Sequence, residues 1–220
     1  MRARLLRAAT WYVGLVLLGS GVALLSTILF GASLLLALTL AIVAGAIALG
    51  IFAMRAPADV RARIAFLART GFIAGILAML SYDISKWILS VADPSPFNPF
   101  EAVHVFGQLL VGENAAPPLV WASGFAYHVF NGVTFAMAYT QFFGAVAGRS
   151  LRLGLITGMA WGLFLEMFQL GLFPGWLSIQ FVAEFATISF AAHLVYGATL
   201  GTIVRRRVLA AGVARSSTAP

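Results

Sequence analysis

Two carboxylates and two histidines lie well inside strongly apolar stretches of this sequence: Asp83, His128, Glu166 and His193. Ionisable residues within a membrane span cost about 2.5 kcal/mol or more on insertion scales, and they mark functional sites by default. Histidine and carboxylate side chains in a dry core can relay protons. Two of each would also suit zinc or non-haem iron, which makes these four residues candidate metal ligands. No pair among them has a local metal spacing such as His-Glu-x-x-His.

Depth along the chain indicates that these residues meet. Asp83 and Glu166 each follow the last arginine of the preceding loop, Arg69 or Arg152, by the same number of residues, and the helical rise places both roughly 21 Å from those charges. Three amide or amine side chains lie one short turn away. We therefore predict one polar core made of Asp83, Lys86, His128, Asn131, Glu166, Gln169 and His193.

Small residues lie on the same helix faces as these polar side chains. Gly154, Gly158 and Gly162 recur every four residues, and Glu166 takes the next step of the stripe. Four-residue spacing keeps all of them on one helix face, where a neighbouring helix can approach closely in a membrane. The predicted packing positions are Gly75, Gly132, Gly154, Gly158, Gly162, Gly197 and Gly201.

The composition indicates whether the segments that hold this core lie in water or in a membrane. Of 220 residues, 61% are hydrophobic and 10% are charged, and cysteine is absent. Soluble domains carry about 25% charged residues. Apolar stretches near the ~20-residue span length occur six times. We therefore predict an all-α polytopic membrane protein in contact with the lipid bilayer, with six transmembrane helices at roughly 11–30, 33–54, 71–91, 119–143, 153–173 and 177–204.

The basic residues set the orientation of these spans. The net charge is +7. Every basic residue except Lys86 lies either before the first span or directly after the second, fourth or sixth span. All of these positions are on the same side of the membrane. The positive-inside bias makes that side cytoplasmic and places both termini there. Topology and anionic lipid headgroups account for these charges, so no nucleic-acid partner is predicted.

The last four spans look like an internal repeat. Aligned with an offset of 83 residues, the third span matches the fifth, and Asp83 meets Glu166. In the spans that follow, 124–134 lies over 189–199 with identical Phe, Ala, His, Gly and Thr. Because the third and fifth spans run in the same direction, the repeats are parallel, with a pseudo-twofold axis along the membrane normal.

This pattern divides the chain into consecutive units. The two repeats follow an N-terminal hairpin, and an amphipathic helix at about 99–112 is predicted on the outer surface within the first repeat. The predicted units are an N-terminal transmembrane hairpin (1–54), a cytoplasmic basic connector along the membrane surface (55–70), repeat 1 (71–147), repeat 2 (148–207) and a cytoplasmic tail (208–220).

Three short motifs resemble the YagU-like inner-membrane proteins of bacteria. They are Lys86-Trp87 with the following Pro-Ser-Pro, the run His128-Val-Phe-Asn131 and the run His193-Leu-Val-Tyr196, and the resemblance covers about residues 66–203. That family has no established biochemical activity. It is associated with survival under acid stress, so the resemblance implies a bacterial inner-membrane location and an acid-tolerance role. The N-terminal hairpin is an addition to the family pattern.

These observations favour a membrane protein whose buried His/carboxylate core is linked to protons or a small solute. One alternative is a structural or assembly subunit, in a homo-oligomer or larger membrane complex, whose polar network, including an Asp83–Lys86 ion pair, only fixes helix pairing. The other alternative is a membrane-embedded enzyme with a metal held by the two acids and two histidines. An enzyme is less favoured, and the sequence assigns no catalytic residue and no cofactor. Because Lys86 takes the place of Gln169, the Asp83 half is the first candidate for a working side.

Overall fold

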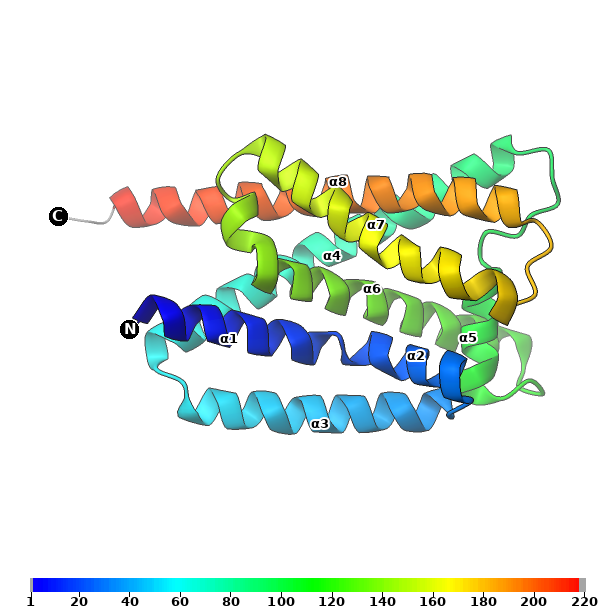
Figure 1. Cartoon of the computed structure of the whole chain (residues 1–220), viewed down its shortest axis with the longest axis horizontal. Helices are drawn as coiled ribbons and strands as arrows, with labels where there is room; N and C mark the ends of the chain where they lie inside the picture. Colours follow the sequence, from blue (N-terminus) through cyan, green and yellow to red (C-terminus); the bar gives the residue numbers. More distant parts are fainter. Residues whose placement is uncertain (1, 218–220) are drawn as a thin grey trace.

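The protein is a bundle of long helices (Figure 1). The computed structural model describes the backbone of residues 2–217 and the side chains of residues 4–211, and this part of the chain contains helices and no strand. The all-α prediction is confirmed over these residues. The helices are α1 (Arg2–Leu17), α2 (Gly19–Phe30), α3 (Leu34–Arg55), α4 (Ala58–Ala92), α5 (Glu101–Val111), α6 (Pro117–Ala147), α7 (Leu151–Trp176) and α8 (Val182–Ser217).

Several of these helices have the length and hydropathy of membrane-spanning helices. Four of them, α3, α4, α7 and the Val182–Ala211 part of α8, are each long and apolar enough to cross a bilayer. The pair α1–α2 meets the same test as one span bent by 43°, which raises the number to five within the described residues. The prediction of apolar membrane-spanning helices is thus confirmed, while α6 is not among those that meet the test.

The first predicted span differs from expectation, because it is broken near Leu18. The Ser20 hydroxyl, just beyond the break, donates to Asn131 Oδ1 at 2.8 Å, and the Ser20 carbonyl accepts from the Tyr127 hydroxyl at 3.1 Å. These bonds tie the bend to α6, and Gly21 beside them leaves room for the Phe135 ring. The α1–α2 segment is therefore part of the protein core, whereas α3 has only 6% of its most apolar 18 residues buried.

The basic connector expected at 55–70 is not a separate surface segment. From Ala58 onward it is the first part of α4, which continues without interruption to Ala92. Val60 and Ile64 on its inner face are buried against Ala9 and Val13 of α1, and this packing draws the segment into the bundle. In the expected tail at 208–220, α8 continues to Ser217, and residues 218–220 lie outside the described part.

The helix expected at about 99–112 is α5, which crosses α6 at the end of the bundle opposite the start of α1 (Figure 1). Its apolar face is buried through Val103 and Phe106. Helices α5 and α6 approach closely because Gly107 and Gly124 lack side chains. A Cβ atom at Gly107 would collide with the Val120 carbonyl, and one at Gly124 would collide with the Val103 carbonyl. This helix closes one end of the space between the longer helices.

The long helices pack in two close pairs, α4 with α6 and α7 with α8, and the pairs meet mainly where α4 contacts α8. Glycines form both seams. A Cβ at Gly158 would collide with the Gly197 carbonyl, and one at Gly75 would lie 2.8 Å from the Ala136 Cβ. The other glycines singled out in the sequence also meet a neighbouring helix, namely Gly132, Gly154, Gly162, Gly197 and Gly201.

Candidate functional site

The α7–α8 seam holds a buried pair of a carboxylate and a histidine. Glu166 Oε2 lies 2.6 Å from His193 Nδ1, with side chains 1% and 6% exposed. The Ser189 hydroxyl donates to the same carboxylate oxygen at 2.8 Å. The other oxygen, Oε1, is buried and has no hydrogen-bond partner within the described part of the chain. One oxygen of this buried carboxylate is therefore satisfied and the other is left without a partner, which is costly in an apolar core.

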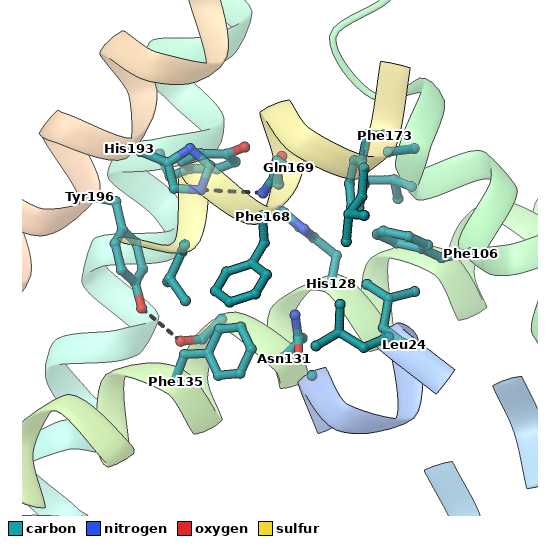
Figure 2. Close-up of a pocket in the computed structure, with 18 of the residues that line it drawn as sticks. Leu24, Phe106, His128, Asn131, Phe135, Phe168, Gln169, Phe173, His193 and Tyr196 are labelled. Atoms are coloured by element: carbon teal, nitrogen blue, oxygen red, sulfur yellow. Dashed lines mark hydrogen bonds between the residues drawn. The ribbon is translucent and has the colours of Figure 1, made fainter. Parts of the chain in front are cut away.

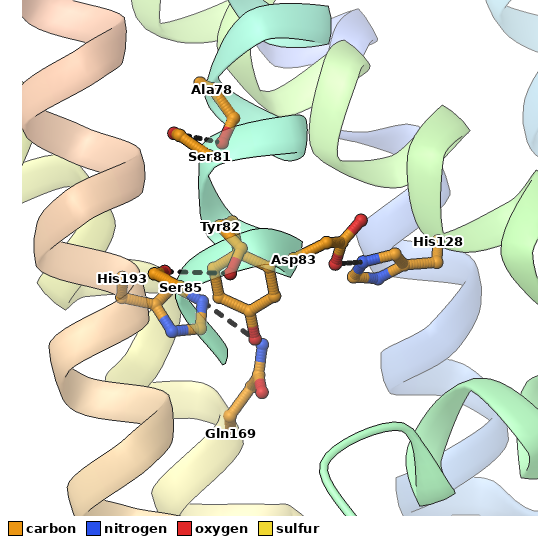
Figure 3. A network of polar contacts seen from close by, with 8 residues as sticks. All are labelled: Ala78, Ser81, Tyr82, Asp83, Ser85, His128, Gln169 and His193. Atoms are coloured by element: carbon orange, nitrogen blue, oxygen red, sulfur yellow. Dashed lines mark hydrogen bonds and ion pairs between the residues drawn. The ribbon is translucent and has the colours of Figure 1, made fainter. Parts of the chain in front are cut away.

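Hydrogen bonds assign the proton on His193. The Nδ1 atom faces the Glu166 carboxylate and the Ser189 carbonyl, which only accept, so Nδ1 carries the hydrogen. Its Nε2 atom lies 3.3 Å from the Gln169 amide nitrogen, which donates to it while the ring is neutral (Figures 2 and 3). A proton added at Nε2 would need an acceptor instead, and rotation of the Gln169 amide would present its oxygen.

A second acid–histidine pair joins α4 to α6. His128 Nε2 lies 2.9 Å from Asp83 Oδ1, as Figure 3 shows, with side chains 16% and 22% exposed. The carboxylate accepts, so Nε2 carries the hydrogen and Nδ1 is left without a hydrogen-bond partner among the described residues. The two pairs therefore differ in burial and in which ring nitrogen faces the acid.

Tyr82 lies between His193 and the Asp83–His128 pair (Figure 3). Its ring centroid is 4.8 Å from that of His193 and 5.8 Å from that of His128. The Lys86 ammonium lies 5.4 Å from the centre of the same ring and interacts electrostatically with both carboxylates. The Asp83–Lys86 ion pair of the structural alternative is absent from the described residues: Asp83 pairs with His128, because Asp83 faces α6 while Lys86 turns toward the cavity.

The polar side chains border a cavity of about 210 Å³ (Figure 2). Its walls come from α2, α4, α5, α6, α7 and α8. Apolar side chains such as Leu24, Phe106 and Phe173 form one side in this view. The polar residues that line it are Tyr82, Lys86, His128, Asn131, Gln169, His193 and Tyr196.

The acids do not line this cavity. Asp83 and Glu166 are not among its lining residues, and each instead contacts a histidine that is. The four candidate metal ligands thus form two pairs, and the described residues contain no group of three or more His, Cys, Asp or Glu side chains placed to hold a metal ion.

Sequence reasoning missed Tyr82, Ser20 and Ser189 as members of this network. Tyr82 precedes Asp83, so the two side chains point to different sides of α4, and only the contact of α4 with both α6 and α8 brings both into one network. The sequence does place Ser189 four residues before His193, on the same helix face. Ser20 gave no signal, since its partner Asn131 is far along the chain.

Comparisons with known proteins add no identification: no family model, no curated protein and no solved structure matches this chain.

Proposed function

We propose that this chain is a six-span bacterial inner-membrane protein whose acid–histidine pairs exchange protons with the central cavity as a small solute binds or passes. The observation that carries the proposal is the buried Glu166–His193 pair at 2.6 Å, with the cavity-facing nitrogen of the ring held by Gln169. The acid-tolerance role and membership of the YagU-like family, both suggested by short motifs, are part of this proposal.

Six spans are supported by the path of the chain. Consecutive long segments alternate in direction, and α1 begins at the end of the bundle where α8 ends (Figure 1). An even number of crossings requires α6 as a span, and its 31 residues reach about 46 Å at the helical rise. Helix α6 contains no Asp, Glu, Lys or Arg, and it packs against most of the other helices. Its low lipid exposure explains its modest hydropathy, since a helix surrounded by protein can carry polar side chains.

A two-fold repeat is supported by equivalent contacts in the two helix pairs. The first helix of each pair carries the acid and the second carries the histidine. The small-residue contacts also correspond: Gly75 faces Ala136 as Gly158 faces Gly201, the residue aligned with Ala136. Matching seams and matching pairs are what duplication of one helical hairpin would leave.

The proton path follows from the assigned hydrogen bonds. A proton from the cavity reaches His193 at Nε2, and rotation of the Gln169 amide accommodates it. The resulting imidazolium faces the Glu166 carboxylate, which can accept the Nδ1 hydrogen and relieve its charge in the core. Histidine is the side chain that changes charge between pH 5 and 8, which suits a response to external acid.

Reconstitution into liposomes tests this function. Internal pH is followed with a trapped indicator after an imposed acid step, for the wild type, for the double variant Asp83→Asn with Glu166→Gln, and for the control Glu101→Gln, an exposed acid of α5. We expect proton entry above that of empty liposomes for the wild type and the control, and background entry for the double variant. Identical background flux in all three would end the proposal.

A further inference from the structure

We infer that the cavity binds a single-chain anionic amphiphile of the fatty-acid class, with its carboxylate on Lys86 and its chain leading out into the bilayer. The inference rests on the proposed function, because it names the solute for the same cavity. It is carried by an ammonium group that the structure buries without a bonding partner, and by a lateral opening of the cavity.

Lys86 is the sole lysine of the chain and is 5% exposed. Its ammonium lies over the Tyr82 ring and has no hydrogen bond or ion pair within the part of the chain that the structure describes. Burying a charged amine with its three donors unused is costly, and buried charges in proteins are normally paired. Because Lys86 lines the cavity, an anion bound there would supply the missing partner.

Two further donors border the same space. The Asn131 amide oxygen is occupied by the Ser20 hydroxyl, which leaves its NH₂ group without a partner among the described side chains, and Asn131 lines the cavity. The His128 Nδ1 atom, also without a partner there, becomes a donor once the ring is protonated. An ammonium, an amide NH₂ and an imidazolium around one space match the two acceptor oxygens of a carboxylate.

The apolar part of the cavity opens sideways. Helix α2 packs mainly on α3 and α6, and α7 on α8 and α6, so the cavity that both line lies in the gap between α2 and α7. Val22 on α2 and Phe164 and Phe168 on α7 line it while being 62%, 43% and 44% exposed. In a membrane these exposed apolar faces contact lipid, so the gap admits a ligand from the bilayer.

The asymmetry of the bundle explains this gap. In a two-fold arrangement, the counterpart of the α4–α8 contact would be the α6–α7 contact. Helix α4 packs closely along α8, whereas α6 meets α7 over a shorter stretch, where the Tyr139 hydroxyl bonds Thr157 at 2.8 Å. Beyond that stretch the two helices diverge and α2 completes the wall.

Size favours a partly enclosed chain over a fully enclosed solute. A volume of about 210 Å³ is smaller than the ~300–1,000 Å³ of clefts that enclose small molecules. The headgroup and first methylenes of an acyl chain therefore fit inside, and the rest of the chain extends through the lateral opening. A phosphodiester head with two chains is a poorer match to this volume.

Binding of this anion is expected to strengthen as the pH falls. The groups around Lys86 are Tyr82 and Asp83 on α4, His128 on α6, Glu166 on α7 and His193 on α8. With neutral histidines, two carboxylates outweigh one ammonium; with both histidines protonated, three cations outweigh two carboxylates. Proton uptake thus changes the sign of the charge that the ligand meets.

Equilibrium binding of laurate to the purified full-length protein in nanodiscs tests the inference. The variants are Lys86→Met, Lys86→Arg and the control Arg69→Met, which removes an exposed cation from the same helix. We expect Lys86→Met to weaken laurate binding at least ~10-fold, Lys86→Arg to retain most of the affinity, and Arg69→Met to bind as the wild type does. Wild-type affinity should exceed that for dodecanol at least ~10-fold and should rise between pH 8 and pH 6, with dodecanesulfonate as the probe whose own charge stays fixed.

The outcomes separate this inference from the proposed function. Equal affinity for laurate and dodecanol, unchanged laurate affinity in Lys86→Met, or binding of phosphatidylglycerol in place of laurate would overturn the fatty-acid assignment, even where the liposomes show proton entry. Laurate binding that depends on Lys86 but not on pH would support the carboxylate site and count against the proton-linked function.

Discussion

Substitution of Gly158 by alanine is the sharpest test of the seam that holds the Glu166–His193 pair. A Cβ at Gly158 would collide with the Gly197 carbonyl oxygen and lie 3.0 Å from both Cα and N of Gly201. All three atoms belong to the α8 backbone, so no side-chain rotation can relieve the contact. Helices α7 and α8 must move apart, and the Glu166–His193 contact one or two helical turns further along must lengthen.

The magnitude follows from the type of contact. Overpacking a close-packed core by one methyl group costs about 1–3 kcal/mol. Replacing glycine by alanine within a helix also stabilises the helix by about 1 kcal/mol. A control variant with the same replacement is needed to separate this gain from the cost of the collision. Gly50→Ala is the matched control, because Gly50 is also within a membrane-length helix and a Cβ added there would meet no neighbouring helix or side chain within 4 Å. The expected difference between the two variants is therefore about 1–3 kcal/mol.

Unfolding in mixed micelles of increasing dodecyl sulfate content, followed by far-UV circular dichroism, measures this difference. The same substitution at Gly75 examines the α4–α6 seam, where the nearest atom is the Ala136 Cβ at 2.8 Å. If Gly158→Ala unfolds within about 0.5 kcal/mol of Gly50→Ala, the close backbone contact between α7 and α8 is wrong.

Two further substitutions probe the polar core. Lys86→Met replaces an unpartnered buried ammonium by an apolar chain of similar length. It is expected to raise the free energy of unfolding of the protein purified without added amphiphile. A lower value in the same dodecyl sulfate titration would mean that the ammonium has a bonding partner. Ser20→Ala is expected to lower it by about 1–3 kcal/mol, because Asn131 and Thr134 of α6 both lose a hydrogen-bond partner. Ser26→Ala, whose hydroxyl bonds only a carbonyl of its own helix, is the control and should be nearly neutral; equal effects of the two serine variants would contradict the α2–α6 connection.

Much of the arrangement could be predicted from composition and spacing. Long apolar stretches interrupted by arginines predict helices of membrane length, because a backbone in lipid must satisfy its own hydrogen bonds. The four-residue glycine stripe through Gly158 and Glu166 indicated a close seam, since that spacing keeps small residues on one helix face. These are local properties, and helical geometry alone converts them into structure.

The predictions that depended on distant partners were less successful. The break at Leu18 follows from bonds between Ser20 and α6, which no local pattern reveals. The start of α4 at Ala58, in a segment predicted as a connector, follows from burial of Val60 and Ile64 against α1.

Composition and residue spacing alone predict a helical protein with apolar helices of membrane length, built around two acids and two histidines that are costly to bury. How these side chains combine depends on the packing of distant helices: Glu166 pairs with His193 and Asp83 with His128, while Lys86 forms an ion pair with neither acid. The tertiary structure also decided that α4 packs along α8 while α6 and α7 diverge, which creates the cavity. The physical reason is that helix periodicity fixes which face a side chain occupies, whereas the identity of the facing helix depends on packing between segments far apart in the chain.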